Sequence, residues 1–153
     1  MILVVPKALK PDLLINTKKE GVSFTIPWGR ADIGLYKEMI GHLNSFGEVL
    51  TEHIGHTGIS PMGEVGLTDQ EIYNRDMDWL SSSDVVVADV STPSLGVGFE
   101  IASAIRQGKS VLCIYRIQEE RRLSAMISGC PDIQVKEYTK LNEAKQIMDD
   151  FFR

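Results

Sequence analysis

Apolar residues recur with helical spacing in the first part of the chain. Four of them predict a helix over residues 32–46 that ends at Gly47, namely Leu35, Met39, Ile40 and Leu43. The next segment, 48–54, is strand-like, and a glycine-rich loop follows at 55–66. Thr68-Asp-Gln-Glu71 has the form of a capping box, so the next helix should run from there to about residue 81.

Strands and helices then alternate to the end of the chain. The β-branched run from Val85 to Val87, followed by Val90, is typical of a strand buried on both faces and predicts a strand at 84–90. Further helices are expected at about 96–106, 123–127 and 141–152, and further strands at 110–115 and 133–138. This alternation predicts an α/β fold: a single Rossmann-like domain over residues 1–153, with a mostly parallel sheet of about five strands and helices on both faces.

The candidate chemistry is concentrated between Asp84 and Glu100, where the buried strand leads through a loop into a helix. Ser94, Gly96 and Gly98 supply a hydroxyl and unhindered backbone N–H groups where that helix begins, and a helix amino terminus favours an anion such as phosphate. Glu100 would repel a phosphate unless it faced another part of the same ligand. The loop therefore predicts a phosphorylated ligand with an electrophilic centre near the carboxylate, although glycines beside a strand often form only a turn.

Asp76 is a second carboxylate in an unusual position. Ile72, Trp79 and Leu80 lie three or four residues from it, so Asp76 shares the apolar face of its helix. A carboxylate on such a face is costly unless it is hydrogen-bonded or catalytic. Two interpretations stay open: Asp76 pairs structurally with an arginine, or it forms with Glu100 the carboxylate pair that glycosidic chemistry requires. We interpret Trp79 as a core residue.

Composition restricts the partners. A formal net charge of −5 and a pI near 5.2 argue against nucleic acid or an anionic membrane as the main partner, because both require a basic surface. Two cysteines are too few for a disulfide framework or a zinc cage, and Cys113 is expected to be a small core residue. We expect no metal and no cofactor. The apolar segment at residues 1–6 is too short for a signal peptide, so we expect an intracellular protein.

Four motifs together make a more specific pattern than the loop alone. They are Phe46-Gly-Glu-Val-Leu-Thr-Glu-His53, Arg75-Asp-Met-Asp-Trp-Leu80, the loop from Asp84 to Glu100, and Leu123-Ser-Ala-Met-Ile127. In this order, over about residues 29–153, the chain resembles the 2'-deoxynucleoside 5'-phosphate N-hydrolases of the nucleoside 2-deoxyribosyltransferase superfamily. The resemblance implies a homodimer with shared active sites that cleaves base from deoxyribose in 2'-deoxynucleoside 5'-monophosphates, in the cytoplasm and also in the nucleus.

The resemblance also implies a role for each matching residue. Glu100 would be the nucleophile that forms a deoxyribosyl-enzyme intermediate, and Asp76 would orient it or handle protons. Ser94 would bind the 5'-phosphate. Another serine would reach that phosphate from the partner subunit together with the two residues that follow it: Ser124, Ala125 and Met126.

Two further residues have open assignments. His53, at the end of its strand, is expected to contact the base or to be a hydrogen-bonded structural histidine, with neither favoured. Met39 lies on the buried side of the first helix, where it contacts the base or packs in the core. Of these two, core packing is the stronger interpretation.

The amino terminus departs from the family pattern. The family opens with a strand that carries a catalytic tyrosine, followed by a Gly-Ser-Ile-Arg-Gly-Gly-Arg loop around phosphate and sugar. An ungapped comparison places Phe24-Thr-Ile-Pro-Trp-Gly-Arg30 at the loop and Gly21 at the tyrosine. Pro27 lacks the N–H that a phosphate cradle uses. The first strand is expected at 22–26 rather than 1–5, and three matching residues are expected to bind substrate: Ile26, Gly29 and Arg30.

Two other functions compete with hydrolysis. A transferase of the same superfamily would pass deoxyribose to a second base, although hydroxyls placed for a 5'-phosphate suit a nucleotide better than a free nucleoside. A non-catalytic nucleotide-binding variant would result if the altered loop abolished turnover. Base release from a deoxynucleoside monophosphate, with and without a second free base, distinguishes hydrolysis, exchange and inactivity.

Restoring the family loop tests the departure. We expect replacement of residues 24–28 by Gly-Ser-Ile-Arg-Gly, together with Gly21→Tyr, to raise kcat/KM about tenfold or more, because N–H donors, a guanidinium and a phenol are added around the charged ligand. Initial rates of base release measure the change. An unchanged rate in a folded dimer would show that Thr25, Gly29 and Arg30 already suffice.

Overall fold

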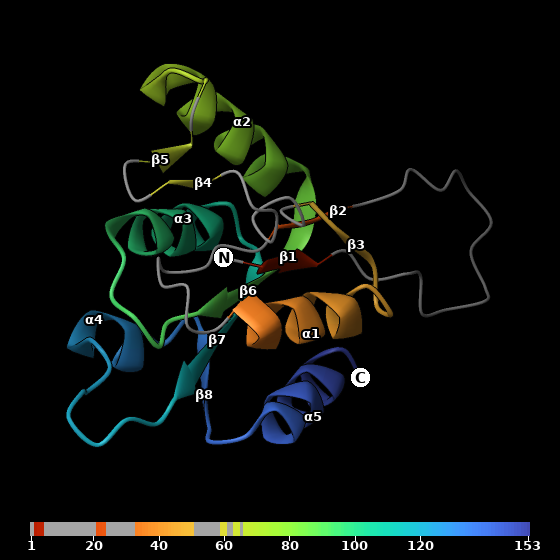
Figure 1. The fold of residues 1–153 in the computed structure, drawn as a ribbon, viewed down its shortest axis with the longest axis vertical. Helices are drawn as coiled ribbons and strands as arrows, with labels where there is room; N and C mark the ends of the chain where they lie inside the picture. Colours follow the sequence, from red (N-terminus) through yellow and green to blue (C-terminus); the bar gives the residue numbers. More distant parts are fainter. Residues whose placement is uncertain (1, 5–20, 24–32, 51–58, 61–62, 65) are drawn as a thin grey trace.

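The computed structural model describes residues 2–4, 21–23, 33–50, 59–60, 63–64 and 66–153. In this part of the chain, strands and helices alternate, and the main sheet lies between two layers of helices (Figure 1). The α/β class predicted from the sequence is therefore confirmed.

Three adjacent parallel strands form the centre of the sheet. They are β6 (Ser83–Asp89), β7 (Ser110–Arg116) and β8 (Gln134–Tyr138), and each begins and ends within one residue of the predicted boundary. From Val86 to Val90 every side chain is buried, as expected for a strand covered on both faces. The strand that precedes the candidate site is thus buried along its carboxyl-terminal half.

Of the predicted sheet of about five strands, only these three have full length, because the other described strands of this sheet are segments of two or three residues. β2 (Gly21–Ser23) pairs with β6, and β3 (Glu48–Val49) pairs with β2, both in parallel. β1 (Ile2–Val4) pairs with β6 antiparallel, so both candidate first-strand regions contribute a short strand. Within the predicted 55–66 loop, β4 (Ile59–Ser60) and β5 (Gly63–Glu64) form a small antiparallel pair.

Helices cover both faces of the sheet, as expected. α1 (Ile33–Leu43) and α5 (Leu141–Phe151) contact each other on one face, and α2 (Asp69–Ser82) and α3 (Leu95–Arg106) contact each other on the other (Figure 1). The short helix α4 (Ala125–Ser128) lies between β7 and β8 in the chain. The candidate loop, which leads from β6 into α3, therefore belongs to the α2 and α3 layer.

Both ends of α2 are held by specific hydrogen bonds. The predicted capping box is present: Thr68 Oγ1 accepts from the N–H of Glu71 at 3.3 Å, and Glu71 Oε2 accepts from the N–H of Thr68 at 2.8 Å. At the other end, Lys109 donates to the carbonyls of Ser81 and Ser83. Burial lowers the pKa of Lys109. This anchoring fixes the helix that carries Asp76.

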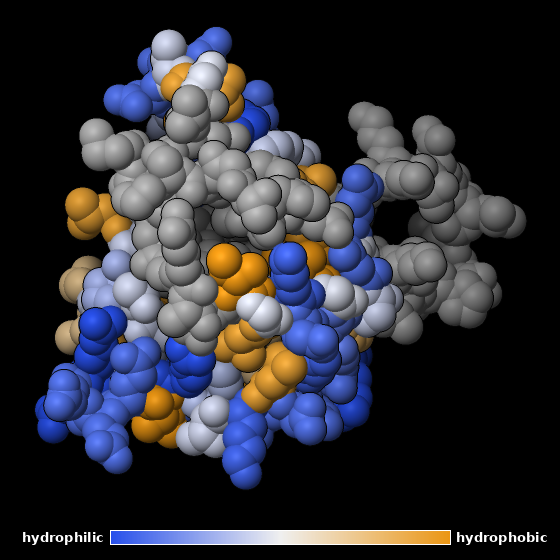
Figure 2. Space-filling model, in the orientation of Figure 1, coloured by the Kyte–Doolittle hydropathy of each residue, from blue (hydrophilic) through white to orange (hydrophobic). Residues whose placement is uncertain are grey.

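The core joins the helices to the sheet. Its largest fully buried side chains are Tyr138, Met39, Leu43, Leu80, Leu112, Ile114 and Met148. On the face shown in Figure 2, hydrophilic side chains predominate and the described apolar residues form separate groups. None of the described helices is long and apolar enough to cross a membrane.

Candidate functional site

The candidate site begins where β6 ends. The Asp89 carboxylate accepts a hydrogen bond from the N–H of Ser91 at 2.8 Å, which turns the chain out of the sheet. Three residues later Ser94 caps α3, and its Oγ accepts from the N–H of Val97 at 3.4 Å. The predicted strand-to-loop-to-helix transition is confirmed.

Ser94 can serve a ligand as well as the helix. Its oxygen accepts the capping bond, so its hydroxyl proton is available to donate to an anion. Gly96 and Gly98 are helical residues without positive φ, and a Cβ atom at Gly98 would meet nothing within 4 Å. The space beside Gly98 is therefore open.

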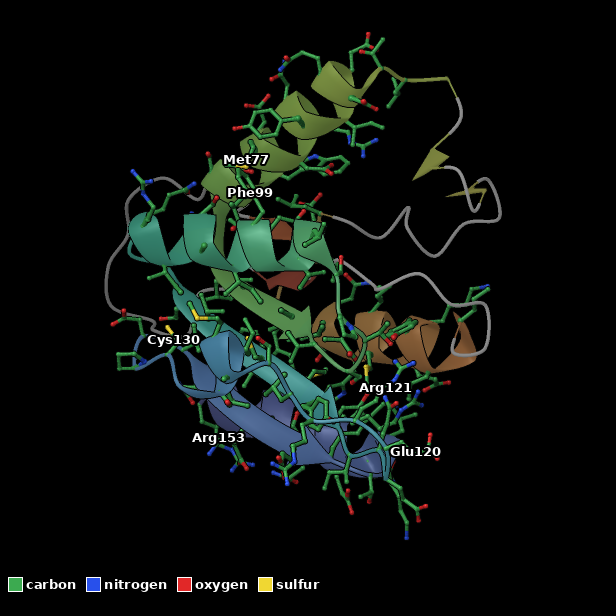
Figure 3. The ribbon with its side chains drawn as sticks, turned by 90° about the vertical axis from the view of Figure 1, so that its left-hand side faces the viewer. Met77, Phe99, Glu120, Arg121, Cys130 and Arg153 are labelled. Carbon is green, nitrogen blue, oxygen red and sulfur yellow. The ribbon has the colours of Figure 1, made fainter. Side chains whose placement is uncertain are left out.

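A cavity of about 810 Å³ lies against α3, between the end of β6 and the segment 120–133. Four of the predicted site residues line it: Ser94, Gly98, Ser124 and Met126. The segment 120–133 forms the far wall of the cavity, opposite α3. Figure 3 shows α3 above this wall, with Glu120 and Arg121 toward one end of it and Cys130 toward the other. The structure thus brings the loop motif and the Leu-Ser-Ala-Met motif to one hollow.

The far wall is tied to the rest of the site by two hydrogen bonds. Tyr115 Oη donates to the carbonyl of Arg121 at 2.7 Å, and Gln118 Nε2 donates to the carbonyl of Ser91 at 3.1 Å. Arg121 and Arg122, both exposed, line the cavity together with Glu120. These arginines were not predicted from the sequence, although they directly precede the Leu-Ser-Ala-Met motif. They place cationic groups beside the predicted phosphate position.

Glu100 lies on the buried face of α3, next to residues that line the cavity. It is 9% exposed and shares the buried face of the helix with Val97, Ile101 and Ala104, which follow helical spacing. It is not one of the residues that line the cavity. A nearly buried carboxylate one and a half turns after the Ser94 cap fits a ligand that passes from the amino terminus of α3 toward the sheet.

Asp76 forms the ion pair with arginine that was one of its two interpretations. Both Nε and Nη2 of Arg75 donate to Asp76 Oδ1, at 3.0 and 2.9 Å, and the guanidinium of Arg75 lies 4.6 Å from the centre of the Trp79 ring. Trp79 is half-buried, so its assignment to the core was wrong. The Asp76 side chain is 31% exposed, which places it at the border of the interior.

The two helices that carry these carboxylates are in contact. The rings of Tyr73 on α2 and Phe99 on α3 pack edge to face, with 6.1 Å between their centres. In Figure 3, Met77 and Phe99 lie at the place where α2 and α3 approach each other. Asp76 and Glu100 are therefore carried by two helices that contact each other.

The remaining predicted residues fall into three groups. Met39 is completely buried in the core, which favours packing over base contact. Ser124 caps α4 through the N–H of Met126 at 3.3 Å, and Ser124, Ala125 and Met126 are exposed. Four residues lie outside the described part of the chain: Ile26, Gly29, Arg30 and His53. Among the described residues, no cluster of three or more His, Cys, Asp or Glu side chains could hold a metal ion.

Known proteins similar to this chain include one family model and several curated relatives. The family model described as nucleoside 2-deoxyribosyltransferase matches residues 25–145. A 5-hydroxymethyl-dUMP N-hydrolase of Tetraodon nigroviridis is 46% identical over 132 residues, which cover 84% of this chain and 92% of that protein. The human protein of the same name is 41% identical over 132 residues, covering 84% of this chain and 75% of its own.

One solved structure supports the fold independently. The structure of the Clostridium botulinum CMP N-glycosidase BcmB matches with a TM-score of 0.61 and 18% sequence identity. The match covers 84% of this chain and 98% of that one. At this level of identity the likeness concerns the arrangement of the helices and strands.

The two cysteines differ in burial, so their reactivity with a thiol reagent tests the structure. Cys130 lines the cavity, whereas burial raises the pKa of the Cys113 thiol to about 12, so that Cys113 carries almost no thiolate near neutral pH. We expect a thiol reagent to modify only Cys130 in the folded protein and both cysteines in denaturant, as measured by intact-protein mass spectrometry. Rapid labelling of a folded Cys130→Ser variant would contradict the burial of Cys113.

Proposed function

The chain belongs to the nucleoside 2-deoxyribosyltransferase family, and from this premise we propose that it is an N-glycosidase that hydrolyses 2'-deoxynucleoside 5'-monophosphates to free base and deoxyribose 5-phosphate. The observation that carries the proposal is the Ser94 cap of α3, which borders an open cavity and is followed by the nearly buried Glu100. Two relatives at 41–46% identity are named as hydrolases of a deoxynucleoside monophosphate.

The main hydrogen-bond donors to the phosphate are uncharged groups. The Ser94 hydroxyl and the free N–H groups of the first turn of α3 point toward an anion, and the helix dipole adds partial positive charge there. Arg121 and Arg122 on the cavity wall supplement this charge. An acidic protein with a net charge of −5 can therefore bind a phosphate through a local arrangement of donors and cations.

Glu100 carries out the covalent step. A carboxylate oxygen of Glu100 bonds to C1' of the sugar while the bond from C1' to the base nitrogen breaks, and the electron pair leaves with the base, which takes up a proton. Water then attacks C1', which releases Glu100 as a carboxylate and leaves deoxyribose 5-phosphate. The absence of an electron-withdrawing 2'-hydroxyl makes the positive charge at C1' easier to form, and the carboxylate stabilises it.

Asp76 assists this step from α2. Arg75 Nε and Nη2 both donate to Oδ1, and we assign to Oδ2 the role of orienting Glu100 or passing a proton to the leaving base. The pairing with arginine and the catalytic role are thus compatible. Arg75 holds the carboxylate in place through one oxygen, and the other oxygen acts on the reacting groups.

The active sites are shared between two subunits. Ser124 lies at an exposed helix cap, and Met126 is 82% exposed, which is unusual for a large apolar residue. Leu95, beside the Ser94 cap, is 96% exposed. These apolar side chains at the mouth of the cavity favour coverage by a second copy, with Ser124 reaching the 5'-phosphate bound across the interface.

Deoxyribosyl transfer to a second base is the alternative activity, favoured by the description of the matching family. Product analysis with and without an added free base separates the two reactions, because a transferase forms a new nucleotide and a hydrolase forms deoxyribose 5-phosphate. Suitable substrates are deoxyguanosine monophosphate and 5-hydroxymethyl-dUMP.

Glu100→Gln tests the nucleophile. We expect kcat for base release to fall by about 10³-fold or more with nucleotide binding largely retained, because the amide keeps the shape but cannot form the glycosyl ester. Glu137→Gln on the exposed side of β8 is the matched control and should keep full activity. Turnover of Glu100→Gln near the parent rate would remove Glu100 from the mechanism, and a parallel loss of thermal stability would indicate a structural role.

Mixed dimers test the shared site. Ser124→Ala should weaken nucleotide binding by about 1 kcal/mol or somewhat more, because one hydrogen bond to a charged phosphate is lost. Combining Ser124→Ala subunits with Glu100→Gln subunits leaves one of the two sites with both native residues, so activity should recover in the heterodimer. No recovery in heterodimers confirmed by native mass spectrometry would contradict sharing of the phosphate site.

A further inference from the structure

The end of β6 contains a carboxylate that the proposed chemistry does not use. Asp89 is completely buried, and its two oxygens accept from different donors: Oδ1 from the N–H of Ser91 at 2.8 Å, and Oδ2 from the hydroxyl of Tyr138 at 3.1 Å. Burial raises the pKa of the Asp89 carboxyl, and the hydrogen bonds from Ser91 and Tyr138 partly offset that shift. A carboxylate buried at this cost needs a reason beyond ordinary packing.

Ser91 extends the contacts of Asp89 to the neighbouring strand. The Ser91 hydroxyl accepts from the N–H of Arg116 at 2.8 Å, and its carbonyl accepts from Gln118 Nε2 at 3.1 Å. The N–H of Ile117 donates to the carbonyl of Tyr138 at 2.9 Å. One hydrogen-bonded network therefore joins the carboxyl ends of β6, β7 and β8, and the first residues of the candidate loop are held within it.

This hydrogen-bonded network holds the loop in place, whereas α3 is held by side-chain packing. Ser94, three residues after Ser91, is only partly buried. In contrast, α3 is packed against the sheet through the buried side chains of Val97, Ile101 and Ala104. Displacing the loop would move the hydroxyl at the cap while Glu100 stays in place through helix packing. Phosphate binding and the covalent step thus have separate structural supports.

We propose that Asp89 is a positioning residue for the 5'-phosphate: through Ser91 and Tyr138 it fixes the loop at the height above the sheet where Ser94 meets the phosphate. This inference rests on the proposed function, because it assumes that Ser94 binds the phosphate of the substrate. It assigns Asp89 no contact with the substrate. Its effect is on how tightly the nucleotide is held.

Removing these contacts should raise KM and leave kcat nearly unchanged. We expect Asp89→Ala to raise KM for a deoxynucleoside monophosphate about tenfold, the usual effect of a lost hydrogen bond to a charged group. Asp89→Asn keeps an acceptor for the Ser91 N–H and should raise KM only about threefold. Tyr138→Phe, which removes only the hydroxyl, should resemble Asp89→Asn. The matched control is Asp84→Asn at the exposed start of the same strand, which should leave both constants unchanged.

The experiment combines steady-state kinetics with hydrogen–deuterium exchange of the peptides that cover residues 89–98 and 141–153. The proposal predicts graded increases in KM at constant kcat, with faster exchange confined to 89–98. Equal falls in kcat across the series, or unchanged KM with faster exchange in both peptides, would indicate a purely structural carboxylate and overturn it. A lower KM in Asp89→Asn would also overturn it, because the carboxylate would then act on the phosphate as a repelling charge.

The two proposals can fail separately. If the parent protein releases no base from any nucleotide, the proposed function fails, and binding of deoxyribose 5-phosphate measured by calorimetry replaces KM as the readout. Weaker binding in the order parent, Asp89→Asn, Asp89→Ala would still support the role of Asp89. Equal binding by all three folded proteins would overturn it. Should Asp89→Ala not fold, Tyr138→Phe and Asp89→Asn decide the question by the same measurements.

Discussion

The burial of β6 from Val86 onward is the constraint on which the rest of the structure depends. Its side chains from Val86 onward are covered on both faces, and its backbone is paired with β7 as far as the N–H of Val90, which donates to Ile114 at 2.9 Å. Such a strand cannot carry a functional group along its length. Polar function is possible only where the chain leaves the sheet, and there the loop groups must be satisfied by a small set of bonds before α3 begins.

Helix periodicity then divides the chemistry around α3. The buried side of α3 carries Glu100 together with Val97 and Ile101, and these two apolar residues line the cavity along with Gly98 and Ala102. The cap at Ser94 lies at the one end of the helix where both sides can be reached. In the proposed mechanism, the ligand enters through the cavity, its charged group binds at the amino terminus of α3, and its reacting carbon lies near Glu100.

Much of this arrangement could be predicted from residues 66–153, where apolar runs, a capping box and a glycine loop agree with one another. The short lengths of β1 to β3 and the existence of β4 and β5 could not be, because segments of two or three residues contain no measurable period. The state of Asp76 was also undecidable. Its partner, Arg75, is the adjacent residue, and neighbours in a helix do not share a face, so spacing gave no indication of the pair. Arg121 and Arg122 were missed because the cavity is formed by segments distant in sequence.

The cap at Ser94 also limits which residues the position can accept. Serine, threonine, asparagine and aspartate all cap helices well, so helix stability alone would permit any of them. The serine hydroxyl accepts the bond from Val97 and keeps a proton for an anion, whereas aspartate would cap α3 and repel a phosphate. A single substitution at this position could therefore reverse the ligand charge that the fold accepts without any loss of stability.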